Sequence, residues 1–190
     1  MLLHGLTGDE HVMWGLEPVI PPSARVLSPR APYPFPGGGY SWVDPAGGPA
    51  PAMQVFREPA QGLARMIEAA GGQGSSRPLV LMGFSQGSAL ALSAVAFGMI
   101  HPAAVVVMAG LLPPGELPPL HGLRVFWGHG RQDELIPVSR ARGDVARLTA
   151  AGADVAYCEA EVGHKLGAEC LKGVRTWLAG LGLDELPVGA

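Results

Sequence analysis

The chain is poor in charge and has no long hydrophobic run. Charged residues make up 15% of its 190 amino acids, the formal net charge is −3, and lysine and arginine form no cluster. A nucleic-acid-binding domain normally carries such a basic cluster to neutralise phosphates, so no DNA or RNA partner is indicated. The longest apolar stretches, near Leu79–Met82 and Ala103–Leu112, fall short of the roughly 20 residues that cross a bilayer. They are typical of buried strands, and no stable membrane insertion is predicted.

Cysteine is also scarce, with only Cys158 and Cys170. Two cysteines do not make a disulfide framework, and these two lack the spacing of a metal site. We therefore expect two buried free thiols and no metal. The N-terminus does not combine a basic segment, an apolar core and a small-residue cleavage site, so secretion by a signal peptide is not indicated. A cytoplasmic location is the expectation.

Apolar runs alternate with helical patterns along the chain, which predicts an α/β fold. Several runs are apolar throughout, as in parallel strands covered on both faces, so we expect a mostly parallel sheet of about six strands with helices on both faces. The length favours a single domain over residues 1–190. The candidate strands are Met1–His4, Arg25–Ser28, Leu79–Phe84, Ala103–Ala109, Arg124–Trp127 and Val155–Cys158, and the candidate helices are Met53–Ala70, Gln86–Met99, Val138–Ala151 and Leu166–Leu178.

Proline and glycine concentrate in two segments, Pro29–Pro51 and Leu112–Pro119. Both lie between regular elements, and we interpret them as ordered surface loops. The first is rich in aromatic residues, which is unusual for a disordered linker. An exposed aromatic loop would also offer a surface for a homodimer.

The most informative motif is Gly83-Phe84-Ser85-Gln86-Gly87, which follows the apolar run Leu79–Met82. A glycine two residues before and two residues after a serine is typical of a nucleophile elbow, where a buried strand turns sharply into a helix and exposes the hydroxyl. Glycine is needed because a Cβ atom at either position would collide where the strand and helix approach. Ser85 is the candidate nucleophile, and a flexible glycine turn is the alternative.

A serine hydroxyl needs a base, and the base needs an acid that orients it. In α/β-hydrolases the acid and then the histidine follow the serine, each after a later strand. Asp133 follows the predicted strand Arg124–Trp127, and His164 follows the predicted strand Val155–Cys158, so these are the candidate acid and base. The residues that fit this order less well are His4, His11, His101, His121, His129, Glu134 and Asp154.

The developing oxyanion needs two backbone N–H donors, one of which comes from the residue after the nucleophile. That residue is Gln86. Leu6, in the glycine-bearing turn Leu3–Asp9 after the first predicted strand, is the candidate for the second donor, with a tight loop between two strands as the alternative. The candidates for lining the substrate pocket are apolar residues in segments that approach Ser85: Leu6, Phe35, Trp42 and Leu135.

Together these motifs resemble the phospholipase/carboxylesterase family, which includes the acyl-protein thioesterases. The resemblance spans nearly the whole chain. It implies an α/β-hydrolase fold, Ser85, Asp133 and His164 as a catalytic triad, and ester or thioester hydrolysis without a cofactor. It also implies Leu6 and Gln86 as the oxyanion donors. The segments that carry the resemblance are Leu2–Leu6 with Gly8-Asp9, Arg30–Pro32, Ser41–Asp44, Gly83–Gly87, Gly130–Asp133 with Ile136-Pro137, and Gly163-His164.

Three positions depart from the family's pattern. Members usually carry additional residues ahead of the His-Gly loop, whereas His4 is the fourth residue here. Either the sheet is shortened at that edge, or the given start of the sequence is not the true one. Ser88 stands where a second glycine is common, and Val43 replaces the more usual phenylalanine. Neither of the last two changes touches the chemistry directly.

The sequence thus predicts a serine carboxylesterase that acts on a small-molecule ester through an acyl-enzyme. Its short loops favour carboxylic esters or thioesters of short to medium acyl chains. Two alternatives stay open. One is an acyl-protein thioesterase or lysophospholipase, and the other is a non-catalytic binding module that keeps the hydrolase scaffold.

Overall fold

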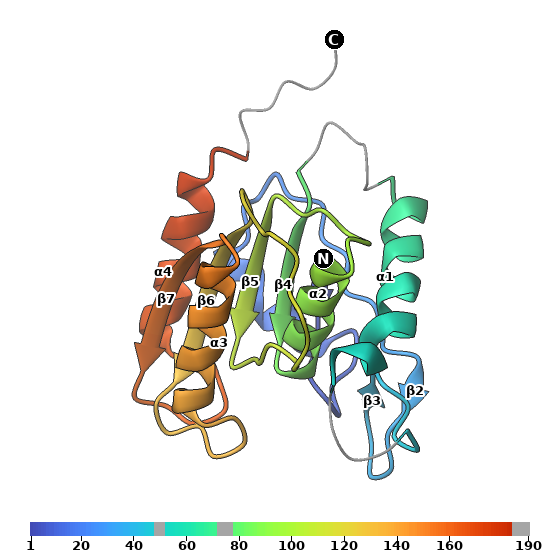
Figure 1. The fold of residues 1–190 in the computed structure, drawn as a ribbon. Coiled ribbons are helices and arrows are strands. Elements are labelled where there is room, and N and C mark those ends of the chain that lie inside the picture. Colours follow the sequence, from blue (N-terminus) through green and yellow to red (C-terminus); the bar gives the residue numbers. More distant parts are fainter. Residues whose placement is uncertain (48–51, 72–77, 184–190) are drawn as a thin grey trace.

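The computed structural model describes residues 1–47, 52–71 and 78–183, and its centre is a parallel five-stranded sheet (Figure 1). The strand order is β1-β4-β5-β6-β7, and every neighbouring pair is parallel. This confirms the expected α/β architecture, and β1 forms one edge of the sheet. The strands are β1 (Leu2–Leu3), β4 (Val80–Phe84), β5 (Ala104–Met108), β6 (Arg124–Gly130) and β7 (Asp154–Ala160).

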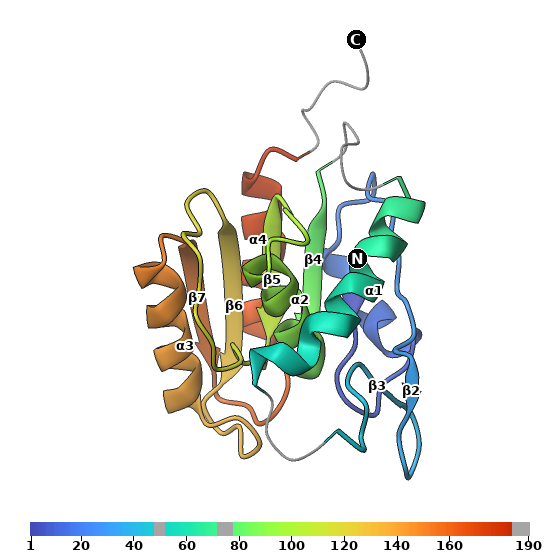
Figure 2. The same ribbon diagram turned by 45° about the vertical axis from the view of Figure 1, so that its right-hand side comes forward.

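Helices cover both faces of this sheet (Figures 1 and 2). The alternation of side chains along a strand explains how two apolar layers form. In β5, Val105 and Val107 belong to the core beneath α1, α2 and α3, whereas Val106 and Met108 belong to the core beneath α4. The helices are α1 (Arg57–Ala69), α2 (Gln86–Ala96), α3 (Val138–Ala150) and α4 (Ala168–Gly180), with short 3₁₀ helices η1 (Val12–Val19) and η2 (Met53–Phe56).

Within the described residues, no helix has both the length and the apolar character needed to traverse a bilayer. The longest α-helices have 13 residues, and α1 and α3 each carry buried residues on one face and exposed residues on the other. That pattern is typical of helices that pack against a sheet.

Two predictions about the segment between β1 and α1 are wrong. Arg25–Ser28 is not a strand; the N–H of Leu2 donates to the carbonyl of Leu27 (2.8 Å), but no ladder forms. The segment predicted as a loop instead contains an antiparallel hairpin of two short strands, β2 (Tyr33–Pro34) and β3 (Tyr40–Ser41). The end of that predicted loop, residues 48–51, lies outside the described residues.

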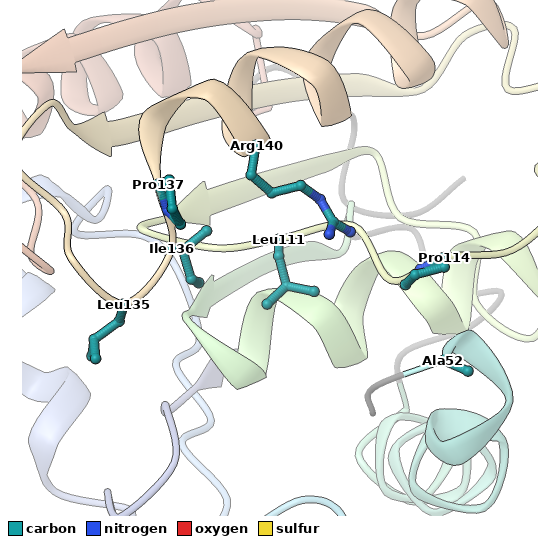
Figure 3. A pocket seen from close by; sticks show the side chains of 7 residues that line it. All are labelled: Ala52, Leu111, Pro114, Leu135, Ile136, Pro137 and Arg140. Carbon is teal, nitrogen blue, oxygen red and sulfur yellow. The ribbon is translucent and has the colours of Figure 1, made fainter. Parts of the chain in front are cut away.

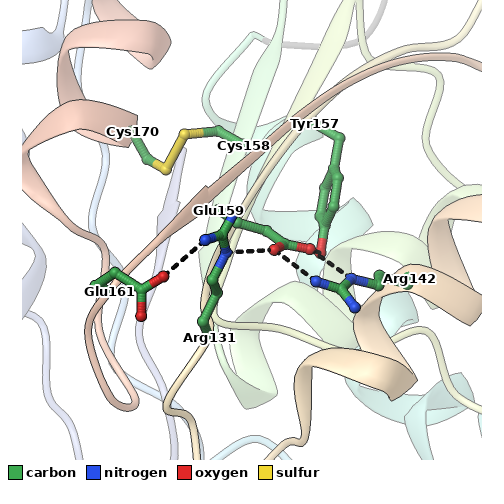
Figure 4. Close-up of polar contacts among 7 residues, drawn as sticks. All are labelled: Arg131, Arg142, Tyr157, Cys158, Glu159, Glu161 and Cys170. Carbon is green, nitrogen blue, oxygen red and sulfur yellow. Dashed lines mark hydrogen bonds and ion pairs between the residues drawn. A yellow bond between two sulfur atoms is a disulfide. The ribbon is translucent and has the colours of Figure 1, made fainter.

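The expectation of free thiols is also wrong, because Cys158 of β7 and Cys170 of α4 form a disulfide (Figure 4). Their Cα atoms lie 5.7 Å apart. Cys158 is on the face of β7 that packs against α4, and Cys170 lies in the first turn of that helix. The bond closes a loop that contains His164.

The next residue of β7, Glu159, forms an ion-pair network that Figure 4 also shows. Arg142 donates two hydrogen bonds to its carboxylate (2.7 and 2.8 Å), Arg131 donates one (2.8 Å), and the Tyr157 hydroxyl donates another (2.9 Å). Arg131 also bonds Glu161 (2.7 Å). These hydrogen bonds, above all those from Arg142, lower the pKa of Glu159 to about 2. The network connects β7 with α3 and with the loop after β6.

Candidate active site

Strand β4 ends in a sharp turn at Ser85, and α2 begins at the next residue. Ser85 has φ 50° and ψ −116°, a conformation that residues other than glycine rarely adopt. Its N–H donates to the carbonyl of Met108 at the end of β5 (2.9 Å), so the neighbouring strand holds the turn in place. The predicted strand–turn–helix arrangement around Ser85 is confirmed.

Close approach of the backbone explains the glycines of this turn. A Cβ atom at Gly83 would lie 2.5 Å from the nitrogen of Ser88, and one at Gly87 would lie 2.2 Å from the carbonyl oxygen of Leu3. Ser88 itself is fully buried and donates from its hydroxyl to the carbonyl of Gly83 (2.6 Å). Gly110 leaves room for it, because a Cβ there would lie 2.4 Å from that of Ser88.

The candidate acid and base meet in the loops after β6 and β7. Nδ1 of His164 lies 2.8 Å from Oδ2 of Asp133. The other carboxylate oxygen accepts the backbone N–H groups of Leu135 (3.0 Å) and Ile136 (2.9 Å). A carboxylate only accepts, so Nδ1 of His164 carries the proton and Nε2 is left with the lone pair.

The surroundings of Asp133 favour its ionised form. Burial by itself raises the pKa of this carboxyl group, but hydrogen bonds from Ile136, His164 and Leu135 outweigh it and hold the pKa below its ordinary value of 3.8. The side chain is buried, so its charge is little screened by solvent. A fixed negative charge therefore faces the imidazole of His164.

The imidazole of His164 lies beside the serine turn. Its ring centre is 5.1 Å from that of Phe84, the residue directly before Ser85. Among the residues that the structure describes, no hydrogen bond joins the Ser85 hydroxyl to His164. Catalytic hydrogen bonds of this kind often tighten only when a substrate is bound.

A second histidine, His129, also lies near Asp133, but it belongs to the core. It is fully buried, its Nε2 donates to the carbonyl of Ile136 (2.8 Å), and that nitrogen is 3.4 Å from Asp133. The His129 ring has no access to solvent, and its N–H already donates to a backbone carbonyl, so it is poorly placed to relay a proton. The geometry therefore favours His164 over His129, as the chain order does.

The loop after β1 lies against the serine turn. A Cβ atom at Gly5 would be 3.2 Å from that of Ser85. The N–H of Thr7 donates to the carbonyl of Tyr40 (3.0 Å), whereas the N–H of Leu6 has no acceptor within the described part of the chain. The N–H of Gln86 is also free there, because the first residue of a helix has no intrahelical acceptor. Two such donors near a serine suit a developing oxyanion.

The side chain of Gln86 ties the hairpin to the serine turn, a contact that the sequence did not reveal. Its Oε1 accepts the N–H of Trp42 (2.9 Å), and its Nε2 donates to the hydroxyl of Ser41 (3.0 Å). The indole N–H of Trp42 donates in turn to the carbonyl of His4 (2.8 Å). Trp42 is only 1% exposed, and these contacts give it a structural role; its place in the lining of the substrate pocket stays a prediction.

His4 is a buried support of the loop after β1. Its Nε2 accepts the N–H of Ala31 (3.1 Å), so its Nδ1 carries the proton and donates to the carbonyl of Gly5 (2.7 Å). Burial lowers the pKa of His4, which favours the neutral ring. The ring also packs on that of Trp42, with centres 5.0 Å apart.

A cavity of about 290 Å³ opens beside the loops that carry the candidate acid (Figure 3). Of the residues predicted to line a substrate pocket, Leu135 lines this cavity and is 74% exposed. Leu6 is exposed on the loop after β1, and Phe35 is half-buried in the turn between β2 and β3; neither lines it. The lining residues are Ala52, Leu111, Pro114, Leu135, Ile136, Pro137 and Arg140.

Metal binding has no candidate in the part of the chain that the structure describes, because no group of three or more His, Cys, Asp or Glu side chains is arranged to hold an ion. The chemistry available at the site is that of a serine, an imidazole, a carboxylate and two backbone N–H groups.

Comparison with known proteins places this geometry in context. The family model described as Phospholipase/Carboxylesterase matches residues 1–181. Among curated proteins, no significant match was found. A carboxylesterase from Mesorhizobium loti has 25% identity and a TM-score of 0.80, with 94% of this chain and 87% of that chain covered.

Two further solved structures share the fold. A carboxylesterase from Bacillus cereus is 20% identical with a TM-score of 0.81, over 95% of this chain and 86% of that one. SOBER1 from Arabidopsis thaliana is 21% identical with a TM-score of 0.79, over 95% of this chain and 96% of that one. The similarity therefore extends over almost the full length of each protein.

Proposed function

Because the chain belongs to the phospholipase/carboxylesterase family and is a carboxylesterase-type hydrolase, we propose that Ser85, His164 and Asp133 hydrolyse carboxylic esters or thioesters of short to medium acyl chains. The observation that carries this proposal is the 2.8 Å hydrogen bond between His164 and Asp133 beside the strained turn at Ser85. A hydroxyl, a base and an oriented acid are the groups that acyl transfer to water requires.

The reaction begins with attack of the Ser85 hydroxyl oxygen on the acyl carbonyl. Nε2 of His164 takes the hydroxyl proton as the new C–O bond forms, and Asp133 stabilises the imidazolium through Nδ1. His164 then gives this proton to the leaving oxygen or sulfur, whose bond to the acyl carbon breaks. Water attacks the resulting acyl-enzyme by the same route and regenerates the serine.

The backbone N–H groups of Leu6 and Gln86 stabilise the oxyanion in each half of this cycle. One such donor contributes roughly 3 to 4 kcal/mol to the lowering of the barrier. The Gln86 side chain holds the hairpin through Trp42 and Ser41, and the hairpin in turn holds the loop that carries Leu6. The two donors are thereby kept in a fixed relation to Ser85.

Hydrolysis of p-nitrophenyl esters from acetate to palmitate tests the proposal, with the matching acyl thioesters measured in parallel. The Ser85→Ala variant should lose at least about 1,000-fold in kcat, because an attacking group is removed. Ser139→Ala is the matched control, since Ser139 is exposed on α3 and should leave the rate unchanged. Activity that survives in Ser85→Ala would rule out the mechanism.

The chain-length profile separates the remaining possibilities. A maximum in kcat/KM among the shorter esters would support the proposed substrate class, and a maximum at palmitate would point to a lysophospholipase or acyl-protein thioesterase. Folded protein without activity on any ester or thioester would favour the binding module. Thermal unfolding followed by circular dichroism distinguishes that outcome from a failure to fold.

A further inference from the structure

The cavity shares a wall with the loop that holds the proposed acid, Asp133. Leu111 lies three residues after Met108, whose carbonyl accepts the N–H of Ser85. Leu135 and Ile136 line the cavity while their N–H groups hold Asp133. The cavity therefore adjoins the Asp133 loop, and segments that follow the carboxyl ends of β5 and β6 form part of its wall.

Among the described residues of the lining, Arg140 is the one charged side chain, and the others are aliphatic. Figure 3 shows it reaching from α3, with its guanidinium between Leu111 and Pro114 and away from Leu135. At about 290 Å³ the cavity is smaller than most drug-binding pockets, which suits a short acyl chain. An aliphatic wall with a cation at one end suits an acyl chain that ends in an anionic group.

The contacts of Arg140 leave part of its guanidinium available. Its Nε donates to Asp144 (2.8 Å) and its Nη2 to the carbonyl of Leu112 (2.7 Å), whereas Nη1 has no acceptor among the described residues. Asp144 is almost completely buried and also pairs with Arg147 (3.3 Å). Two guanidinium groups thus share one carboxylate, and one positive charge remains uncompensated within this cluster.

We propose that this cavity binds the acyl part of the substrate and that Arg140 pairs with a carboxylate at the end of that acyl chain. The preferred substrates would then be half-esters or half-thioesters of dicarboxylic acids, hydrolysed to the free diacid and an alcohol or thiol. Arginine suits this role because its planar N–H groups match the geometry of a carboxylate. The inference rests on the proposed function, since it assigns the acyl group of the same reaction.

A matched pair of substrates isolates the carboxylate. The p-nitrophenyl half-ester of adipic acid and p-nitrophenyl hexanoate have acyl chains of equal length and the same leaving group. We expect a higher kcat/KM for the adipate half-ester. In Arg140→Gln, the ratio of the two kcat/KM values should fall by about 10- to 100-fold, the range expected for a hydrogen-bonded charge pair, mainly through KM.

Arg147→Gln is the control for damage to the cluster. Arg147 also binds Asp144 and the loop carbonyl of Gly115 (2.9 Å), but it does not line the cavity. Its loss should lower the adipate-to-hexanoate ratio by less than Arg140→Gln does, because the net charge of the cluster falls by one while Nη1 of Arg140 still faces no acceptor among the described residues. In the unmodified protein, high salt should lower the adipate-to-hexanoate ratio, because an exposed charge pair is screened.

Two results would overturn the inference: a preference for hexanoate in the unmodified protein, or equal changes in the ratio for Arg140→Gln and Arg147→Gln. If neither ester is hydrolysed, the proposed function fails, and calorimetric titration with adipate then tests the anion site by itself. Binding of adipate that Arg140→Gln abolishes would still support the site. No binding to the unmodified protein would overturn it.

Discussion

At the scale of single residues, Ser85 combines a proposed chemical role with an unfavourable backbone. A side chain held in such a region costs roughly 1 to 3 kcal/mol, and it persists only because the surroundings fix it. Here the carbonyl of Met108 holds the N–H of Ser85, and Gly83 and Gly87 allow the close packing of β4, α2 and the loop after β1. The structure thus stabilises a conformation that the residue alone would not adopt.

Replacing Ser85 by alanine or glycine should separate strain from chemistry. Both variants should be inactive, but glycine relieves the strain at φ 50° while losing roughly 0.5 to 1 kcal/mol of backbone entropy. We therefore expect Ser85→Gly to be more stable than Ser85→Ala by about 1 kcal/mol in urea unfolding. At Ser139, on α3, the alanine variant should instead be more stable than the glycine variant. The same order at both positions would contradict the assignment of strain.

Chain order and strand ends predicted Ser85, Asp133 and His164 as the candidate triad, because each of these positions is set by local sequence around a strand. The residues that line a substrate pocket were harder to predict from the sequence. Trp42 and Leu135 were both chosen as apolar residues, yet Trp42 is buried against His4 and Leu135 is exposed beside the cavity. Only the packing of segments distant in sequence decides between the two.

At the scale of elements, β7 is joined to its neighbours by different chemistry on its two faces. The disulfide from Cys158 connects it to α4, and the ion-pair network of Glu159 connects it to α3 and to the loop after β6. Both connections adjoin the loop that carries His164. The position of this loop therefore depends on β7 keeping its contacts with both layers.

Reduction of the disulfide should destabilise the protein by about 3 kcal/mol, the chain-entropy value for a loop of this size. A protein of this length loses about 2 to 4 °C of Tm per kcal/mol, so melting in the presence of dithiothreitol should shift by about 6 to 12 °C. The double variant Cys158→Ala with Cys170→Ala should melt at one temperature with or without the reductant. An unchanged Tm of the reduced unmodified protein would refute the expected stabilisation.

Glu159 should make the free energy of unfolding depend on pH in the acidic range. Its pKa is about 2 in the folded protein and 4.5 ordinarily, so its stabilising effect is fully present above about pH 4.5 and disappears as the pH falls towards 2. The difference in unfolding free energy between the unmodified protein and Glu159→Gln should therefore be smaller at about pH 3 than at about pH 7. Urea titrations at both pH values measure this.

Glu161→Gln provides the comparison, because that side chain is 63% exposed and bonds only Arg131 among the described residues. Its effect at neutral pH should be the smaller of the two. Equal effects of the two substitutions would show that the contacts of Glu159 with Arg142 and Tyr157 contribute nothing.

The longer strands and the α-helices were predictable because their sequence patterns are local. The two-residue strands were not, because they form only where a pairing strand lies beside them. Strands β4 to β7 coincide with local apolar runs and the four α-helices with local helix-favouring segments, and their locations agree with the sequence interpretation. Arg25–Ser28 resembles a strand but forms no ladder with β1, which is only two residues long. The hairpin of β2 and β3 was missed because each strand has two residues and one of these is proline. The pairing of Cys158 with Cys170 was missed because sequence spacing does not give a distance.

At the scale of the whole molecule, one sheet separates two apolar layers. Adjacent residues of β5, such as Val105 and Val106, belong to opposite layers, so neither layer can loosen without affecting the strand that both share. We expect a single cooperative unfolding transition, with far-ultraviolet circular dichroism and tryptophan fluorescence giving the same midpoint. Two separated midpoints would contradict the prediction that residues 1–190 form one domain.

The disulfide also determines whether the fragments of a proteolytically cleaved chain stay covalently connected. If a protease cuts any peptide bond between Cys158 and Cys170, the two fragments stay covalently joined, and α4 remains attached to the body of the protein. A cut beside His164 would leave a single band on a non-reducing gel and two bands after reduction. The loop that carries the proposed base can therefore be opened in a molecule that keeps its full mass apart from one added water.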